Sequence, residues 1–261
     1  MNAVIERDVE YAFGATTMRG LLIADVGNIA APTVVLIHDA FGLAGFSLHE
    51  ARRYATLGYT VFAADVWGDR KQPAGNHEVG PLIGSMAADR EEWLGRIDAA
   101  HRTACEQPEV NPHRIVTVGY CFGGSSALEY LRTGGEVRGV VAIHPGLDLL
   151  DEDAEWSPVS GAAVLACIGD DDPMATRMQR TGLQAALTAN DLDWEFDVYG
   201  GTVHAFTNPR LAASPQPTIA AYNERAATRS QEATTRFLHE TLHPRTTALT
   251  SVGARNDQEE S

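Results

Sequence analysis

Apolar residues recur along the chain in short blocks, and most blocks are followed by a stretch with helical spacing. Near the N-terminus, residues 9–13 and 18–24 have strand character, and the turn-prone Gly14-Ala15-Thr16-Thr17 between them predicts a hairpin. The next block, Thr33-Val34-Val35-Leu36-Ile37, shows no polar alternation. Continuous apolar runs of this kind are typical of strands in a parallel sheet that is covered by helices on both faces.

The rest of the chain repeats this strand-and-helix alternation. Further strands are expected at Thr60–Ala64, Ile115–Val118, Val137–Ile143, Ala162–Ile168 and Trp194–Tyr199. Helices are expected at 47–57, 82–107, 125–134, 175–190 and 218–239, with a long loop over 67–81. About eight strands, the first two antiparallel, indicate a doubly wound α/β sheet with an antiparallel edge. We expect one domain over residues 1–243 and a disordered polar tail over 244–261.

Charge and cysteine content narrow the class of protein. The formal net charge is −15, from 20 basic and 35 acidic residues, which argues against a nucleic-acid partner because such affinity depends on Lys and Arg. The three cysteines, at 105, 121 and 167, lack the spacing of a disulfide framework or a zinc site, so we expect no metal or other cofactor. No apolar run is long enough to span a bilayer, and the N-terminus lacks a signal-peptide pattern. These features favour a cytoplasmic protein without a membrane partner.

One motif lies between a strand and a helix in the middle of the chain. Gly119-Tyr120-Cys121-Phe122-Gly123 places glycines two residues before and after a cysteine, which is the spacing of a nucleophile elbow. The small neighbours allow the strained turn that presents the nucleophile. Cys121 is therefore the candidate nucleophile. The alternative is an inert buried cysteine in a glycine-rich turn.

A cysteine nucleophile needs a base, and the base needs an acid that orients it. Asp172 follows the strand that ends at Ile168, and His204 follows the strand that ends at Tyr199, so the order is nucleophile, acid, base. The neighbours Asp170 and Asp171 are expected to face solvent or to cap the next helix. His38 and His144 also end strands, and we interpret each as a buried histidine whose polar atoms are satisfied.

Backbone amides are expected to bind the oxyanion of an acyl-transfer reaction. The N–H of Phe122 follows the nucleophile directly, and the N–H of Ala40 lies in the loop after the strand that ends at Ile37. The alternative for this loop is an ordinary strand-to-helix turn.

With these residues in place, the chain resembles the dienelactone hydrolase family, whose members have the α/β-hydrolase fold and a Cys-Asp-His triad. The resemblance covers most of residues 30–240. The segments that carry it are His38–Gly42, Gly58-Tyr59 with Ala64-Asp65, Gly119–Gly124, Gly169–Pro173, His204–Pro209 and Tyr222–Ala227. It implies that Asp39 occupies the place of a carboxylate, usually Glu, that helps to activate the thiol. Phe41, Tyr120, Phe206 and Asn208, which flank the motif residues, are candidates for the substrate pocket.

The chain also departs from the family's dienelactone enzymes, which bind the carboxylate of their substrate with arginines. Asn208 stands where one of these arginines would follow the catalytic histidine, and no arginine lies near Glu78, where the other is expected. Arg210 and Arg90 are candidate substitutes. The resemblance therefore predicts the reaction better than the substrate.

The sequence thus predicts a hydrolase of small carboxylic esters or lactones that uses Cys121 as its nucleophile, acting as a monomer or homodimer. Two alternatives stay open: an acyltransferase or thioesterase with the same triad, and a non-catalytic ligand binder on a hydrolase scaffold. A nucleotide-binding oxidoreductase is disfavoured, because Gly119-x-x-x-Gly123-Gly124 is not the GxGxxG pattern.

Overall fold

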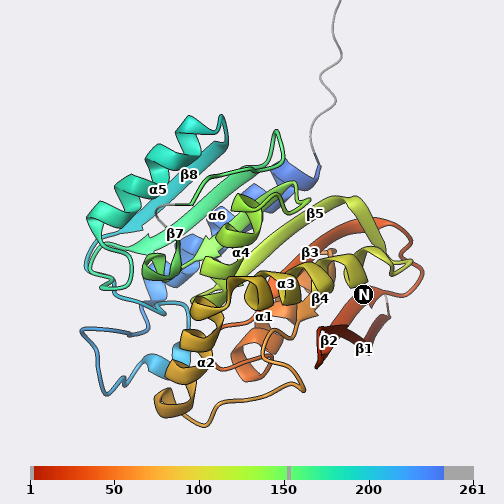
Figure 1. Cartoon of the computed structure of the whole chain (residues 1–261), viewed down its shortest axis with the longest axis horizontal. Coiled ribbons are helices and arrows are strands. Elements are labelled where there is room, and N and C mark those ends of the chain that lie inside the picture. The colour runs from red at the N-terminus through yellow and green to blue at the C-terminus, as the bar shows by residue number, and fades with distance from the viewer. Residues whose placement is uncertain (1–2, 152–153, 244–261) are drawn as a thin grey trace, which may run out of the picture.

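The computed structural model describes residues 3–151 and 154–243, and its centre is a single eight-stranded sheet (Figure 1). The strands lie in the order β1-β2-β4-β3-β5-β6-β7-β8. Their bounds are β1 Val4–Phe13, β2 Thr16–Asp25, β3 Ala31–Ile37, β4 Thr60–Ala64, β5 Val110–Tyr120, β6 Gly139–Ile143, β7 Ala163–Gly169 and β8 Asp193–Tyr199. The pairs β1–β2 and β2–β4 are antiparallel, and the remaining pairs are parallel. The expected sheet with an antiparallel edge is confirmed.

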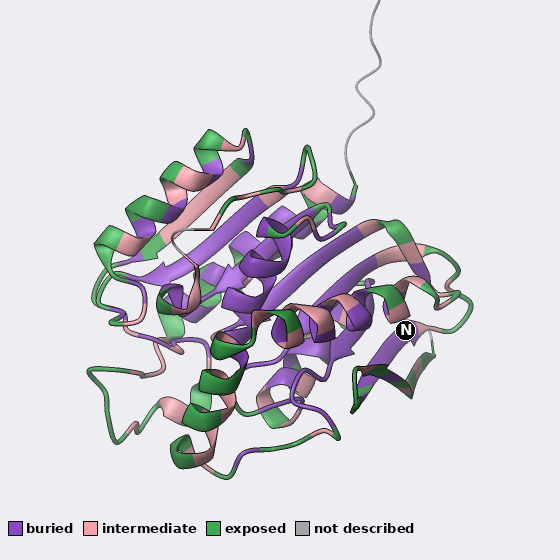
Figure 2. Ribbon diagram, in the orientation of Figure 1, coloured by how far each residue is buried: buried purple, intermediate pink, exposed green. Residues whose placement is uncertain are grey.

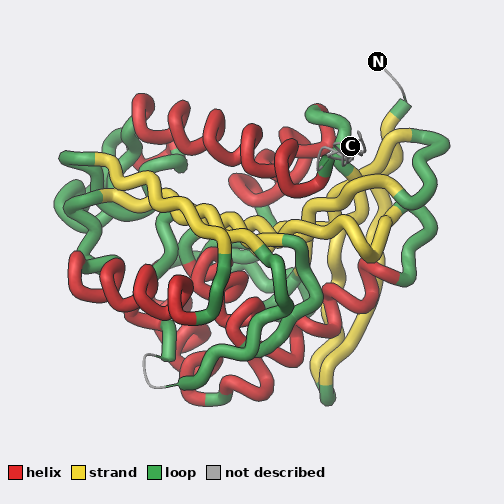
Figure 3. The backbone as a smooth tube through the Cα atoms, turned by 90° about the horizontal axis from the view of Figure 1, so that it is seen from above, coloured by secondary structure: helices red, strands yellow, loops and turns green. Residues whose placement is uncertain are grey.

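Helices cover both faces of this sheet, as the view along its edge shows (Figure 3). Their bounds are α1 Gly45–Thr56, α2 Asn76–Ala88, α3 Arg90–Cys105, α4 Phe122–Arg132, α5 Arg177–Ala189 and α6 Glu224–Leu242. One core contains side chains of α1 and α6, and the other contains side chains of α3, α4 and α5. The central strands between these layers are buried on both sides (Figure 2). The continuous apolar runs in the sequence reflect this double burial.

The expectation of one helix over 82–107 after a loop over 67–81 was wrong. Two helices occupy this region, because α2 begins at Asn76 and ends at Ala88, and α3 begins at Arg90. Asp89 separates them with a non-helical backbone, and its carboxylate accepts a hydrogen bond from the Glu92 amide at 3.0 Å. Aspartate is a strong N-cap because it satisfies an amide that the first turn of a helix leaves free. The cap therefore starts a new helix within an otherwise helical pattern.

The expected start of the last helix, at 218, was also wrong. The amide of His204 donates to the Ile219 carbonyl, and the Ala221 amide donates to the His204 carbonyl, both at 3.1 Å. This bridge at Ala220 keeps the chain out of a helix there, and the side chain of Asn223 then caps α6 by accepting from the Ala226 amide. The predicted tail over 244–261 lies outside the described residues.

The carboxyl ends of the central parallel strands lie at one edge of the sheet, where the loops that carry the candidate residues meet. The end of β5 lies between those of β3 and β6, and β7 and β8 follow. Across the described ranges, no helix combines the length and apolarity that a bilayer crossing needs.

Candidate active site

Cys121 lies at the turn between β5 and α4 in a strained backbone conformation. Its φ is 55° and its ψ is −119°, a region that residues with a Cβ seldom adopt. Its amide donates to the Ile143 carbonyl at the end of the neighbouring strand, at 3.0 Å. The side chain is only partly buried. The turn thus holds the thiol at the sheet edge, above the first turn of α4.

The two flanking glycines are required by close backbone packing. A Cβ added to Gly119 would overlap the backbone of Gly123, and a Cβ added to Gly123 would overlap the carbonyl of Ile37. The glycine spacing therefore has the steric reason that was inferred from the sequence. It also brings the loop after β3 against the elbow.

Asp172 and His204 form a buried hydrogen-bonded pair. Asp172 Oδ2 lies 2.8 Å from His204 Nδ1, and Oδ1 accepts from the Met174 amide at 2.8 Å. The two residues are 2% and 3% exposed, respectively. The adjacent Asp170 and Asp171 are both exposed, and Asp170 pairs with Arg180 at 2.6 Å. Of the three aspartates, the structure thus places only Asp172 against the histidine.

His204 is held in a position that favours its charged form. Nδ1 is engaged by Asp172, whereas Nε2 is buried and has no hydrogen-bond partner within the described ranges. Burial opposes protonation of the ring, but the negative charge of the Cys121 thiolate and the bond to Asp172 raise the pKa of His204 to about 10. The raised pKa favours the imidazolium form of His204.

Two free backbone amides lie next to the thiol. Neither the Ala40 amide nor the Phe122 amide donates a hydrogen bond within the described residues, and the Ala40 carbonyl accepts from Trp67 Nε1 at 3.2 Å. Because a Cβ on Gly123 would overlap the Ile37 and His38 carbonyls, the loop that carries Ala40 lies against the start of α4. Both amides are therefore free to donate; their role as oxyanion donors stays a prediction.

Asp39 lies in the same loop, and it is 8% exposed. Burial raises the pKa of Asp39 to about 6, although the Phe41 amide and the charge of Arg210 oppose that rise. Its Oδ1 accepts from the Phe41 amide at 2.9 Å, and no hydrogen bond joins it to Cys121. In this state the carboxylate orders its own loop.

The buried histidines at the ends of β3 and β6 have both ring nitrogens engaged, as was expected. His38 Nε2 accepts from the Val66 amide at 3.0 Å, and its Nδ1 contacts the Asp39 carbonyl. His144 bonds to the amide of Cys121 and to the hydroxyl of Thr207. The link from His144 to Cys121 was missed from the sequence, because nothing in the chain near His144 marks a residue so far away as its partner.

The four pocket candidates divide into interior and surface residues. Tyr120 and Phe206 are 1% and 0% exposed, so both lie in the core beneath the site, whereas Phe41 is 43% exposed. Asn208 lines a cleft of about 480 Å³, together with Thr207, which lies three residues after His204. The other residues lining this cleft are Gly45, Phe46, His49, Glu50, Pro209, Arg210, Tyr222, Ala227, Thr228 and Gln231.

The two candidate arginines differ in their partners. Arg90 Nη1 contacts the buried Glu129 at 2.6 Å, and its Nη2 donates to the Leu149 carbonyl at 2.9 Å, so its guanidinium is engaged within the protein. Arg210 is exposed and forms no ion pair within the described residues. Of the two, only Arg210 has a guanidinium that is free to bind an anion.

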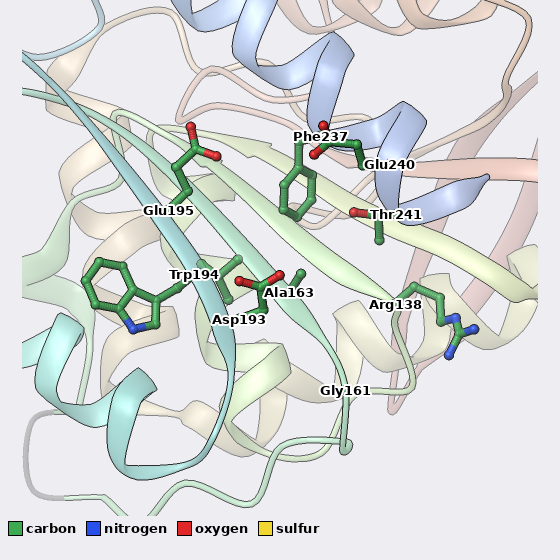
Figure 4. Close-up of a pocket in the computed structure, with 10 residues that line it drawn as sticks. Arg138, Gly161, Ala163, Asp193, Trp194, Glu195, Phe237, Glu240 and Thr241 are labelled. Atoms are coloured by element: carbon green, nitrogen blue, oxygen red, sulfur yellow. The ribbon is translucent and has the colours of Figure 1, made fainter. Parts of the chain in front are cut away.

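A separate cavity of about 290 Å³ lies at the opposite ends of β7 and β8 (Figure 4). Its wall includes Asp193, Trp194 and Glu195 from β8 and Phe237 from α6. It contains no pairing of a nucleophile with a histidine. The candidate catalytic residues therefore lie at the other edge of the sheet, near the turn that carries Cys121.

The comparisons with known proteins agree on one family. A family model described as "Dienelactone hydrolase family" matches residues 18–242. A solved structure of a dienelactone hydrolase-like promiscuous phosphotriesterase from metagenomic libraries is 32% identical, with a TM-score of 0.81, over 92% of this chain and 99% of that one. A probable 2-oxo-3-(5-oxofuran-2-ylidene)propanoate lactonase of Bradyrhizobium sp is 24% identical over 67% of this chain and 73% of its own length. A putative carboxymethylenebutenolidase of Salmonella typhimurium is 22% identical over 68% of each chain.

Proposed function

Since the chain belongs to the dienelactone hydrolase family and is a carboxylic-ester hydrolase with the α/β-hydrolase fold, we propose that it cleaves small esters or lactones through a covalent intermediate on Cys121. The observation that carries this proposal is the Asp172–His204 hydrogen bond at 2.8 Å beside a cysteine in a strained elbow. A thiolate is the reactive form of cysteine, and a neighbouring imidazolium stabilises it.

The reaction begins with attack of the Cys121 sulfur on the carbonyl carbon, which moves the π electrons of the carbonyl onto its oxygen. The amides of Ala40 and Phe122 donate to this oxyanion. As the tetrahedral intermediate collapses, the C–O bond to the alcohol breaks, and His204 gives its proton to the leaving oxygen. The product of this half-reaction is a thioester on Cys121; from a lactone, the alcohol stays attached to the acyl group.

Water completes the cycle. Neutral His204 removes a proton from water, and the resulting hydroxide attacks the thioester carbonyl. The same two amides bind the second oxyanion, and the carboxylic acid leaves as the thiolate is regenerated beside the imidazolium. Asp172 keeps Nδ1 of His204 protonated throughout, so that Nε2 carries out both proton transfers.

We further propose that the substrate carries a negative charge near the scissile bond. Arg210 lines the same cleft as Thr207 and Asn208, it forms no ion pair within the described residues, and its charge already acts on Asp39. The oxo-acid lactone in the name of the Bradyrhizobium relative is an anion of this class. Arg210 would bind the carboxylate from a position two residues further along the chain than Asn208.

The test is hydrolysis of p-nitrophenyl acetate and of a panel of neutral and anionic lactones, with an aryl phosphotriester added because one relative is described as a promiscuous phosphotriesterase. We expect ester or lactone turnover that Cys121→Ala abolishes and that iodoacetamide blocks. Cys105→Ala is the matched control, since Cys105 is also partly exposed but lies in α3, away from the triad. Full turnover by Cys121→Ala would contradict the proposal; saturable ester binding without turnover would favour the ligand-binder alternative, and faster acyl release to an alcohol or thiol than to water would favour an acyltransferase.

We also propose that residues 1–243 form one domain, that the protein works in the cytoplasm, and that it is a monomer or homodimer. The three cysteines are free thiols in the structure, which suits a reducing compartment. Size-exclusion chromatography with light scattering tests the oligomeric state.

A further inference from the structure

His144 lies directly behind the elbow, at the end of β6, and it is 1% exposed. Its Nδ1 lies 3.2 Å from the backbone nitrogen of Cys121, and its Nε2 lies 2.8 Å from Thr207 Oγ1. One residue thus contacts the main chain of the proposed nucleophile and the loop that carries the proposed base, three residues after His204.

The partners of His144 fix its proton. The Cys121 N–H donates to the Ile143 carbonyl at 3.0 Å and shares its proton with Nδ1 of His144 at 3.2 Å. A backbone N–H can only donate, so Nδ1 is an unprotonated acceptor. The ring proton is therefore on Nε2 and is donated to the Thr207 hydroxyl. Burial and the positive charge of His204 hold the pKa of His144 well below its usual range, which keeps this ring neutral.

Neutrality matters because the rings of His144 and His204 lie side by side. Their centroids are 5.2 Å apart, with an interplanar angle of 67°. Among the described residues, the titratable rings that face the His144 ring are those of His204 and Tyr120, and the backbone nitrogen of Cys121 contacts it. A second cation at this place would oppose the imidazolium form of His204, whereas a neutral ring with a fixed tautomer does not.

We propose that His144 is a positioning residue, a neutral hydrogen-bonded bridge from the Cys121 backbone to Thr207 that fixes the nucleophile relative to His204. The elbow and the His204 loop come from different strands, β5 and β8, and the described residues offer no other side chain that bonds to both. This inference rests on the proposed function, because it assigns the bridge to the same triad. His144 does not touch the reacting atoms in this role.

Two pairs of variants test the bridge one end at a time. Thr207→Val removes the hydroxyl while keeping the shape of the side chain, and Thr207→Ser restores it. His144→Asn keeps an acceptor near the position of Nδ1 but cannot reach Thr207, and His144→Phe loses both bonds. Thr181→Val is the matched control, since its hydroxyl bonds to the Arg177 carbonyl on an exposed face of α5.

Two readouts are needed, and one of them does not depend on ester turnover. The first is kcat and KM for p-nitrophenyl acetate; the second is the pH at which the 240-nm thiolate absorbance of Cys121 appears, with the rate of its alkylation by iodoacetamide. We expect Thr207→Val and His144→Asn each to lower kcat about 10-fold to 100-fold with little change in KM, as for loss of one buried hydrogen bond. In both variants thiolate formation should move to higher pH, Thr207→Ser should recover both properties, and the double variant should lose little more than either single one.

The possible results distinguish the proposed role of His144 from the proposed function on which it rests. If wild-type protein hydrolyses no substrate but the variants still change the thiolate titration and alkylation rate, the bridge stands and the proposed function fails. If folded Thr207→Val and His144→Asn proteins keep the wild-type thiolate titration and alkylation rate, the bridge is wrong whatever the turnover. Thermal unfolding of each variant shows that it is folded, and the Thr207 pair decides the matter if a His144 variant does not fold.

Discussion

Tyr120, the residue before the proposed nucleophile, donates its hydroxyl proton to Glu50 of α1 at 2.7 Å. Since that proton is committed, the Tyr54 hydroxyl is the donor in its 2.8 Å contact with Tyr120. Arg53 completes the cluster by contacting Glu50 at 2.8 Å. A buried network of hydrogen bonds thus joins the turn at Cys121 to α1. The Tyr120 phenol belongs to this network and packs beneath the site.

This network should contribute measurably to stability. We expect Tyr120→Phe to lower the free energy of unfolding by about 1–3 kcal/mol, because a buried charged acceptor loses one donor. Tyr130→Phe is the matched control: its hydroxyl bonds to Asp98, whose side chain is 45% exposed, so water can replace the lost bond. Urea unfolding of both variants measures the difference, and equal losses would show that the network adds nothing specific.

The steric role of the elbow glycines is tested by adding one methyl group. Gly123→Ala should prevent the native turn, because the new Cβ would overlap the Ile37 carbonyl. Gly182→Ala in α5 is the control, since a Cβ there meets nothing within 4 Å, and we expect it to stabilise the helix by up to about 1 kcal/mol. Circular dichroism and Tm report both; a Gly123→Ala protein with wild-type Tm and activity would refute the packing argument.

The choice among the three aspartates can be tested directly. Asp172→Asn should lower kcat about 10⁴-fold, because the amide favours the wrong tautomer of the histidine, as a comparable change does in serine proteases. Asp171→Asn changes an exposed neighbour and should leave kcat unaltered. Steady-state kinetics with an activated ester measures both, and the assignment fails if the Asp171 variant shows the larger loss.

Stability should depend on pH through His204. The folded pKa of about 10 lies above the ordinary value of 6.5, so the folded state binds more protons between these values. The resulting stabilisation is fully present below about pH 6.5 and is lost as the pH rises through about 10. Because the Cys121 thiolate contributes to the raised pKa, Cys121→Ala should flatten this decline. Unfolding curves between pH 6 and 10 test the prediction, and parallel pH profiles for the two proteins would contradict it.

Arg210 is proposed to bind a negatively charged group of the substrate. We expect Arg210→Gln to raise KM for a lactone that carries a carboxylate about 10-fold or more, with little effect on its neutral methyl ester, because only the anion loses a charged partner. Arg177→Gln is the control, an exposed arginine at the start of α5. If Arg210→Gln changes KM equally for the two substrates, Arg210 does not distinguish a charged substrate from a neutral one.

The sheet and the order of the candidate triad were predictable because they depend on local patterns. Val34–Ile37 is apolar throughout because it is buried on both faces, and Gly119 and Gly123 mark a turn that tolerates no Cβ. Features that depend on distant partners were not predictable. The last helix starts late because 219–221 pairs with His204, and the sequence near His144 contains no sign that its ring reaches Cys121.

Side-chain direction was a further limit. Tyr120 was placed in the substrate pocket because it precedes Cys121, but successive residues of a strand point to opposite faces of the sheet. Its phenol lies on the α1 side, in the core. A pocket residue cannot be assigned from proximity in sequence unless the face of the strand is known.

The central claim is that Cys121 becomes acylated during turnover. The most direct measurement is rapid acid quench of the enzyme during hydrolysis of p-nitrophenyl acetate, followed by peptide mass spectrometry, with Cys105→Ala protein run alongside. We expect an acetyl group on the peptide that contains Cys121, formed and lost at rates compatible with kcat, in both wild-type and Cys105→Ala proteins. Undiminished turnover by Cys121→Ala, or an acetyl group that forms only on another residue, would contradict the account.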